Sequence, residues 1–245
     1  RMLEATAPGG ALILVEKILV PNAELDELFV KLYREMKKAN GYTEEAILRI
    51  AQKTASWNNT QPWQVLIASG EAVERFRKLM LELAGGGSIP GHYTVEPQSD
   101  FPFPREYRGV ALERRRACGF QLYDAVGVQR GDKAGYARQS MRNFALFDAP
   151  HVAIITTDEA LGVYGAVDCG AYVTNFMTAA TAYGVGTIAQ AALAVHSTSI
   201  REHFGIGDDR RVVCGISFGR PDTSHPVNGY RTTRAPLEEV VRWEG

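Results

Sequence analysis

The chain has few cysteines, no long apolar run and almost no net charge, and each shortage argues against a class of protein. Its 245 residues include three cysteines without metal-ligand spacing, so we expect neither a disulfide framework nor a metal site. Two charged residues interrupt the apolar stretch 11–20. This stretch therefore resembles neither a signal peptide nor a membrane span. We expect a cytoplasmic protein that does not contact a membrane.

The charge balance argues against nucleic acid as a partner. Lysine and arginine number 27 and the acids 28, which leaves a net charge of -1 and no bulk field toward polyanions. Arg114 to Arg116 form a basic cluster with acids nearby, which indicates a solvated helix face. Hydrophobic residues make up 45% of the chain, enough for a sizeable core.

The pattern of apolar residues predicts an α+β protein without internal repeats. Strands separated by paired helices do not give the regular alternation of a doubly wound sheet. We expect strands over residues 65–68, 152–157, 186–191 and 211–218. We expect helices over residues 25–36, 43–55, 71–83, 107–126, 136–145, 166–183, 199–204 and 236–242.

Two of these segments bear on function. Residues 166–183 are small and apolar on almost every side, which predicts a deeply buried central helix. Residues 85–109, from Gly85 to Gly109, form the longest irregular stretch. A loop of this length is either a lid or binding segment, or an exposed excursion.

Two short motifs mislead. Gly184-Val-Gly186-Thr-Ile-Ala189 fits a dinucleotide-binding pattern, but a helix precedes it and a strand follows, the reverse of what that site needs. Gly215-Ile-Ser217-Phe-Gly219 fits a hydrolase nucleophile elbow, but prolines follow where the elbow needs a helix. We therefore assign neither chemistry, and we expect Ser217 to be an ordinary strand residue.

The most informative segment is 56–63, which reads Ser-Trp-Asn-Asn-Thr-Gln-Pro-Trp. It should form a short loop between a helix and a strand. Its tryptophans offer apolar plates, and its amide side chains offer paired donors and acceptors for a flat heteroaromatic ligand. Considered alone, such a stretch is more often an ordinary turn.

With these features placed, the chain resembles the FMN-dependent nitroreductase superfamily, closest to the nitroaromatic and nitrobenzoate reductases. The similarity runs from about residue 51 to the C-terminus. Segment 56–63 is its specific part, and the supporting blocks are 117–123, 143–150, 168–175, 186–192, 214–219 and 231–241.

The resemblance implies a nitroreductase-like α+β fold, with a mixed, mostly antiparallel sheet flanked by helices, in an intertwined homodimer. It implies two FMN sites at the subunit interface and NADH or NADPH as reductant. The flavin carries the chemistry, so no side chain is assigned as catalytic. The implied FMN-binding residues are Lys31, Arg34, Ser56, Trp57, Asn59, Gln61, Thr187, Ile188, Ala189, Gln190, Gly219, Arg231 and Arg234.

The N-terminal segment departs from the family pattern. Relatives carry an Arg-Ser-x-Arg clamp for the phosphate, whereas this chain has Lys31-Leu-Tyr-Arg34. Losing one charge-assisted contact costs roughly 1.5–3 kcal/mol. We expect one domain overall, with a divergent N-terminal helical segment (1–45) followed by the FMN-binding part (46–245).

Three functions follow as hypotheses. The first is NAD(P)H-dependent reduction of nitroaromatic or quinone-type acceptors by ping-pong hydride transfer through FMN. The second keeps the flavin but performs reductive dehalogenation or substrate dehydrogenation. The third is a cofactor-free scaffold, which only the altered N-terminal clamp supports.

Overall fold

The computed structural model describes residues 44–85, 93 and 95–244. The helix expected over residues 25–36, with Lys31 and Arg34, lies outside the described residues, as does part of the 85–109 segment. Within the described residues, no helix combines the length and apolarity needed to cross a bilayer.

A four-stranded sheet forms the centre of the fold, in the order β1-β2-β4-β3, with every pairing antiparallel. This confirms the predicted α+β, mostly antiparallel architecture. The β-branched run of β2 is buried on both faces, as expected for a central strand. The strands are β1 (Gln64–Ser69), β2 (His151–Asp158), β3 (Gly186–Gln190) and β4 (Arg210–Gly219).

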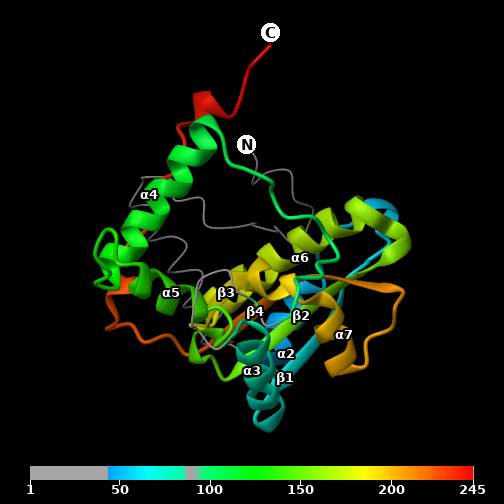
Figure 1. Ribbon diagram of the computed structural model, residues 1–245. Coiled ribbons are helices and arrows are strands. Elements are labelled where there is room, and N and C mark those ends of the chain that lie inside the picture. Colours follow the sequence, from blue (N-terminus) through cyan, green and yellow to red (C-terminus); the bar gives the residue numbers. More distant parts are fainter. Residues whose placement is uncertain (1–43, 86–92, 94, 245) are drawn as a thin grey trace.

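Helices cover both faces of the sheet (Figure 1). Alternate residues of β2 point to opposite faces. Ala153 and Ile155 pack in one core cluster with α2 (Glu44–Ala51) and α6 (Gly162–Ala182). Val152 and Ile154 pack in another with α3 (Glu71–Leu83) and α7 (Ser197–Phe204).

The helix α6 is buried on one face only. Tyr172 and Phe176 lie in the core, whereas Val163, Tyr164 and Val167 are exposed by 70%, 61% and 59%. The prediction of burial on almost every side is therefore wrong for the single chain. An apolar stripe of α6 is left without a covering element among the described residues.

A second exposed unit consists of α4 (Gly109–Ala125) and the C-terminal tail. Figure 1 shows α4 standing away from the sheet, with the tail beside one end of it. Arg114 on α4 pairs with Glu239 of the tail at 2.9 Å. No residue of α4 is buried. Like α6, this unit exposes apolar side chains that no described residue covers.

Several expected helices differ from the structure. The expected helix 43–55 is α2, which ends at Ala51, and the expected helix 166–183 is α6, which begins at Gly162. The expected helix 136–145 is α5 (Lys133–Met141), which begins three residues earlier and is followed by turns over residues 142–145. The expected helix 236–242 is wrong, since only the 3₁₀ turn Leu237–Glu239 forms. So short a segment needs a buried face, and Leu237, Val240 and Trp243 are all exposed.

Candidate functional site

Residues 56–61, here called the amide loop, form a tight turn before β1. Asn58, Asn59 and Gln61 have positive φ values of 52°, 56° and 47°. Asparagine tolerates this left-handed region better than most residues, and each such residue costs roughly 1–2 kcal/mol. Local strain of this kind collects at functional sites. The conformation therefore supports the special role predicted for this segment.

Hydrogen bonds inside the amide loop hold the turn. The Ser56 Oγ accepts from the Gln61 main-chain N–H at 2.9 Å. The Asn59 N–H donates to the Ser56 carbonyl at 3.0 Å. Ser56 thus shapes the turn, while the side chains of Trp57, Asn59 and Gln61 lie at the surface.

Two charged residues from distant parts of the chain also hold this segment. The Asp168 Oδ2 accepts from the Trp57 main-chain N–H at 3.1 Å. The Arg210 guanidinium donates to the Pro62 carbonyl at 2.8 Å. Neither residue was predicted from the sequence. Asp168 could have been identified from the sequence, because it is the single charged residue of an otherwise mostly apolar helix.

The second predicted segment is β3, an edge strand that pairs only with β4 among the described strands. Ile188 and Ala189 are exposed and Thr187 is half-buried. Gln190 is buried, and its Nε2 donates to the Asn143 carbonyl at 2.8 Å. Its Oε1 accepts from the Ser217 hydroxyl. Gln190 can therefore offer a ligand its backbone but not its amide side chain.

Gly219 ends β4 opposite Gly186. A Cβ at Gly219 would lie 2.6 Å from Cδ of Pro150. The close packing against Pro150 therefore explains why glycine is needed at position 219 without any contact to a ligand. Its predicted contact with FMN stays a prediction.

The predicted phosphate-binding arginines lie on the exposed tail. Arg231 donates to the carbonyls of Asn228 and Tyr230 at 2.9 and 2.8 Å. Arg234 donates to the Thr232 Oγ1 at 2.8 Å. In the part of the chain that the structure describes, neither forms an ion pair with a carboxylate, so both positive charges remain available to an anion.

One chain does not bring these segments together. The amide loop leads into β1 at one edge of the sheet, and β3 forms the other edge. Three strand spacings separate the edges by about 14 Å. The register adds to this distance, because Thr187 is level with Ser69, at the far end of β1.

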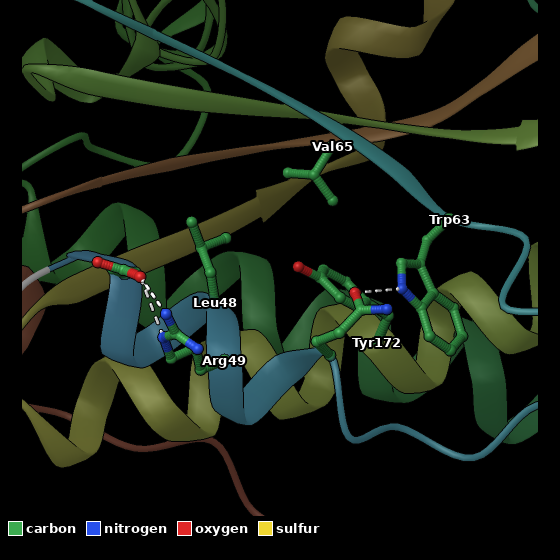
Figure 2. Close-up of a pocket in the computed structure, with 7 residues that line it drawn as sticks. Leu48, Arg49, Trp63, Val65 and Tyr172 are labelled. Carbon is green, nitrogen blue, oxygen red and sulfur yellow. Dashed lines mark hydrogen bonds and ion pairs between the residues drawn. The ribbon is translucent and has the colours of Figure 1, made fainter.

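A pocket of 370 Å³ opens beside the amide loop (Figure 2), on α2, β1 and α6. Trp63 and Tyr172 stack in it with ring centroids 5.2 Å apart. The Trp63 Nε1 donates to the Gln52 Oε1 at 3.0 Å, and the Gln52 Nε2 donates to Gln61 Oε1 at 3.2 Å. None of the predicted cofactor residues lines this pocket. Its Gln52 connects Trp63 to the Gln61 side chain of the amide loop.

Three buried ionisable groups of the core beside α6 are poor acid–base catalysts at neutral pH. Burial raises the pKa of Cys169 to about 11, of Tyr172 to about 12 and of Cys214 to about 12. All three therefore stay protonated. Among the described residues, no group of His, Cys, Asp and Glu side chains could hold a metal ion.

Comparison with known proteins decides the family. The sequence pattern described as "Nitroreductase family" matches residues 43–220. The chain belongs to the nitroreductase family. The dinucleotide-like and elbow-like motifs lie, as predicted, at a helix-to-strand junction and inside β4.

This nitroreductase-family chain has curated relatives of similar length. It is 34% identical over 206 residues to the nitroreductase NfnB of Mycolicibacterium smegmatis, covering 82% of each chain. It is 34% identical over 195 residues to a chloronitrobenzene nitroreductase of Comamonas testosteroni, covering 80% of this chain and 84% of the relative.

Solved structures agree with the fold. The crystal structure of the FMN-dependent nitroreductase NfnB from Mycobacterium smegmatis in complex with NADPH matches with a TM-score of 0.74 and 31% identity. The match covers 84% of this chain and 90% of that one. The nitroreductase-like fold predicted from the sequence is therefore confirmed.

Proposed function

We propose that this nitroreductase-family chain is an FMN-dependent NAD(P)H oxidoreductase that reduces nitroaromatic or quinone-type acceptors, and that it acts as a homodimer with two shared FMN sites. The observation that carries the proposal is the placement of the amide loop and β3 at opposite edges of one sheet. Each edge presents part of a flavin site, and a second copy would supply the rest.

The helix α6 suggests how two copies would meet. Its 21 residues span about 30 Å. The amide loop lies beside its first half through Asp168, and β3 follows its C-terminal end. If the two-fold axis passes perpendicular to α6 near its middle, the helices run antiparallel, and the first half of one faces the second half of the other. The exposed stripe of α6 would be covered, and each amide loop would approach the partner's β3.

The residues present fit an FMN divided in this way. Asn59 presents an exposed amide, which suits the donors and acceptors of the flavin ring. The exposed Gln61 amide would exchange its long hydrogen bonds to Gln52 and Asn59, of 3.2 and 3.4 Å, for the flavin. The outer edge of β3 presents main-chain groups that β4 does not pair. Arg231 and Arg234 present cations that suit a phosphate dianion. The division of the chain into residues 1–45 and 46–245, with Lys31 and Arg34 assisting the phosphate, belongs to the same proposal.

Bound FMN would supply the redox chemistry, accepting a hydride from NADH or NADPH and passing reducing equivalents to the acceptor. The protein would orient the ring, exclude water and bind the two substrates in turn. The relatives named above support nitroaromatic acceptors. A cytoplasmic location fits the three free cysteines, Cys118, Cys169 and Cys214.

The test uses the purified full-length protein. Bound flavin should give a yellow protein absorbing near about 450 nm. Anaerobic reduction with NADH or NADPH, followed by 4-nitrobenzoate, should restore the oxidised spectrum. Reoxidation by a halophenol instead would favour dehalogenation. A colourless protein that FMN does not reconstitute would favour the scaffold and overturn the proposal.

A further inference from the structure

We propose that Asp168 and Arg210 are positioning residues that fix the amide loop in its flavin-binding conformation, one at each end of the loop. This inference rests on the proposed function, because it assigns the task of the two residues to that same site. Neither side chain needs to contact the flavin for the effect.

Asp168 anchors the start of the loop. Its carboxylate accepts from the Trp57 N–H, the first amide of the 3₁₀ turn Trp57–Asn59. Beside this bond, the Trp57 ring meets Tyr164 edge-on, with centroids 4.6 Å apart. Both contacts come from one face of α6, one turn apart. The strained turn is therefore tied to the helix that would also form the dimer interface.

Arg210 anchors the end of the loop. It is 8% exposed, and no described carboxylate pairs with it. Its Nη2 donates to Pro62 O and Thr156 O, both at 2.8 Å, and its Nε donates to Thr156 Oγ1 at 3.3 Å. A buried cation without an acid is costly and persists where its donors are needed. Here the guanidinium fork joins β2 to the loop, a span that a single ammonium cannot reproduce.

The anchored segment combines a rigid base with an exposed tip. Pro62 and Trp63 are buried after the loop, and Thr54 is buried before it, where it accepts from Asn175 Nδ2 at 2.7 Å. Between these points Asn59 and Gln61 are exposed. Left-handed residues persist only where surrounding contacts fix them. Without the two anchors, the loop would relax and its amides would lose their alignment with the flavin.

The test follows flavin release from the holoprotein, measured on dilution by recovery of free-flavin fluorescence. Asp168→Ala should raise the FMN dissociation constant by about tenfold or more, because one charge-assisted contact is lost. Asp168→Asn keeps an oxygen acceptor and should stay within about threefold of the parent. The bound-flavin spectrum should move toward that of free FMN in Asp168→Ala and not in Asp168→Asn.

Arg210→Lys keeps the charge but loses the fork, so it should also weaken FMN binding. Matched controls are Arg211→Lys, on the same strand, and Asp132→Ala, which removes a carboxylate that accepts from the Gly135 N–H at 2.8 Å. Both controls should retain parental FMN affinity. Circular dichroism and dimer mass should be unchanged in Asp168→Ala.

The outcomes separate the two proposals. Parental affinity and spectrum in Asp168→Ala, with FMN bound to the parent, would overturn the positioning role alone. Equal losses in Asp168→Ala and Asp132→Ala would overturn it too, because they would reflect general destabilisation. A parent that binds no FMN would overturn the proposed function and this inference together.

Discussion

The Trp57 main-chain N–H donates to the Asp168 carboxylate at 3.1 Å, although 111 positions separate the two residues in sequence. The bond joins a surface turn at one sheet edge to the long helix α6. The conformation of the amide loop therefore depends on tertiary packing as well as on its own sequence. The predictions below test the interface, the cofactor site and the framework that supports them.

The exposed stripe of α6 should be the dimer interface. Val167→Glu places a charge where the partner's helix would pack, and a buried unpaired charge is strongly destabilising. The dimer dissociation constant should rise by at least about a hundredfold. Light scattering after size-exclusion chromatography measures the mass of the particle in solution. Flavin content should fall as the dimer dissociates, because each site spans two chains.

Val95→Glu is the control for this prediction. Val95 is 41% exposed and lies outside α6, three residues before Gln98, which pairs with His196. This variant should remain dimeric. A monomeric parent, or a dimeric Val167→Glu that keeps its FMN, would remove α6 from the interface.

The tail arginine should hold the FMN phosphate. Arg234→Ala removes a cation and should weaken FMN binding by about one to two decades. Stability should change by less than about 0.5 kcal/mol, since the residue is exposed. Flavin fluorescence on dilution gives the affinity. The control is Arg242→Ala. Arg242 is also an exposed tail arginine, and its guanidinium pairs with Glu244 at 2.9 Å. This variant should bind FMN as the parent does.

The ion pair between Asp100 and Arg201 should stabilise the fold. Their side chains are only 8% and 12% exposed, and Asp100 Oδ2 also accepts from the Val212 N–H at 2.7 Å. Asp100→Ala leaves a buried cation and should lower the free energy of unfolding by about 3–5 kcal/mol. Glu82→Ala breaks an exposed pair with Lys78 and should cost less than about 1 kcal/mol. Similar denaturant midpoints for the two variants would contradict this account.

Acid stability should depend on His196. This residue is 2% exposed, its Nε2 has no partner among the described residues, and burial lowers its pKa below the usual 6.5. The unfolded chain therefore binds the proton more readily. The contribution of His196 is complete above pH of about 6.5 and is lost as pH falls toward the folded pKa.

The check is the free energy of unfolding measured from about pH 7.5 to about pH 5.5, one unit either side of the usual histidine pKa. His196→Gln carries no titratable group, so its curve should be flatter than the parent's. His225→Gln, at an exposed position, is the control. Parallel curves for parent and His196→Gln would show that another group titrates.

Much of the fold could be predicted from local patterns. The apolar spacing of Glu71–Leu83 predicted α3 at its observed bounds. The β-branched run in 152–157 predicted β2 within a residue at either end. These segments bury faces that their own sequence determines. The predicted helix 236–242 does not form, because local spacing alone does not stabilise a short helix. Leu237, Val240 and Trp243 have helical spacing, but no described residue covers them.

The site was predictable only in part. The amide loop and β3 were located by resemblance to a family, but their placement at opposite edges depends on strand order. The anchors were missed because Asp168 and Arg210 contact the loop only after α6 and β4 have packed. Gln190 was predicted to bind FMN, but its side-chain amide forms hydrogen bonds to Asn143 and Ser217 inside the fold. Its sequence position alone did not reveal these contacts.

The central claim is that each flavin site takes its amide loop from one chain and β3 from the other. The tail with Arg234 follows Gly219, which pairs with Gly186 of β3, so we assign the tail to the same chain as β3. Unfolding and refolding a mixture of an Asn59→Ala/Gln61→Ala variant with an Arg234→Ala variant tests it directly. Mixed dimers would contain one site with both defects and one intact site, so about a quarter of all sites should regain parental FMN affinity. If each site belonged to a single chain, every site would keep a defect, and the absence of any high-affinity sites would contradict the account.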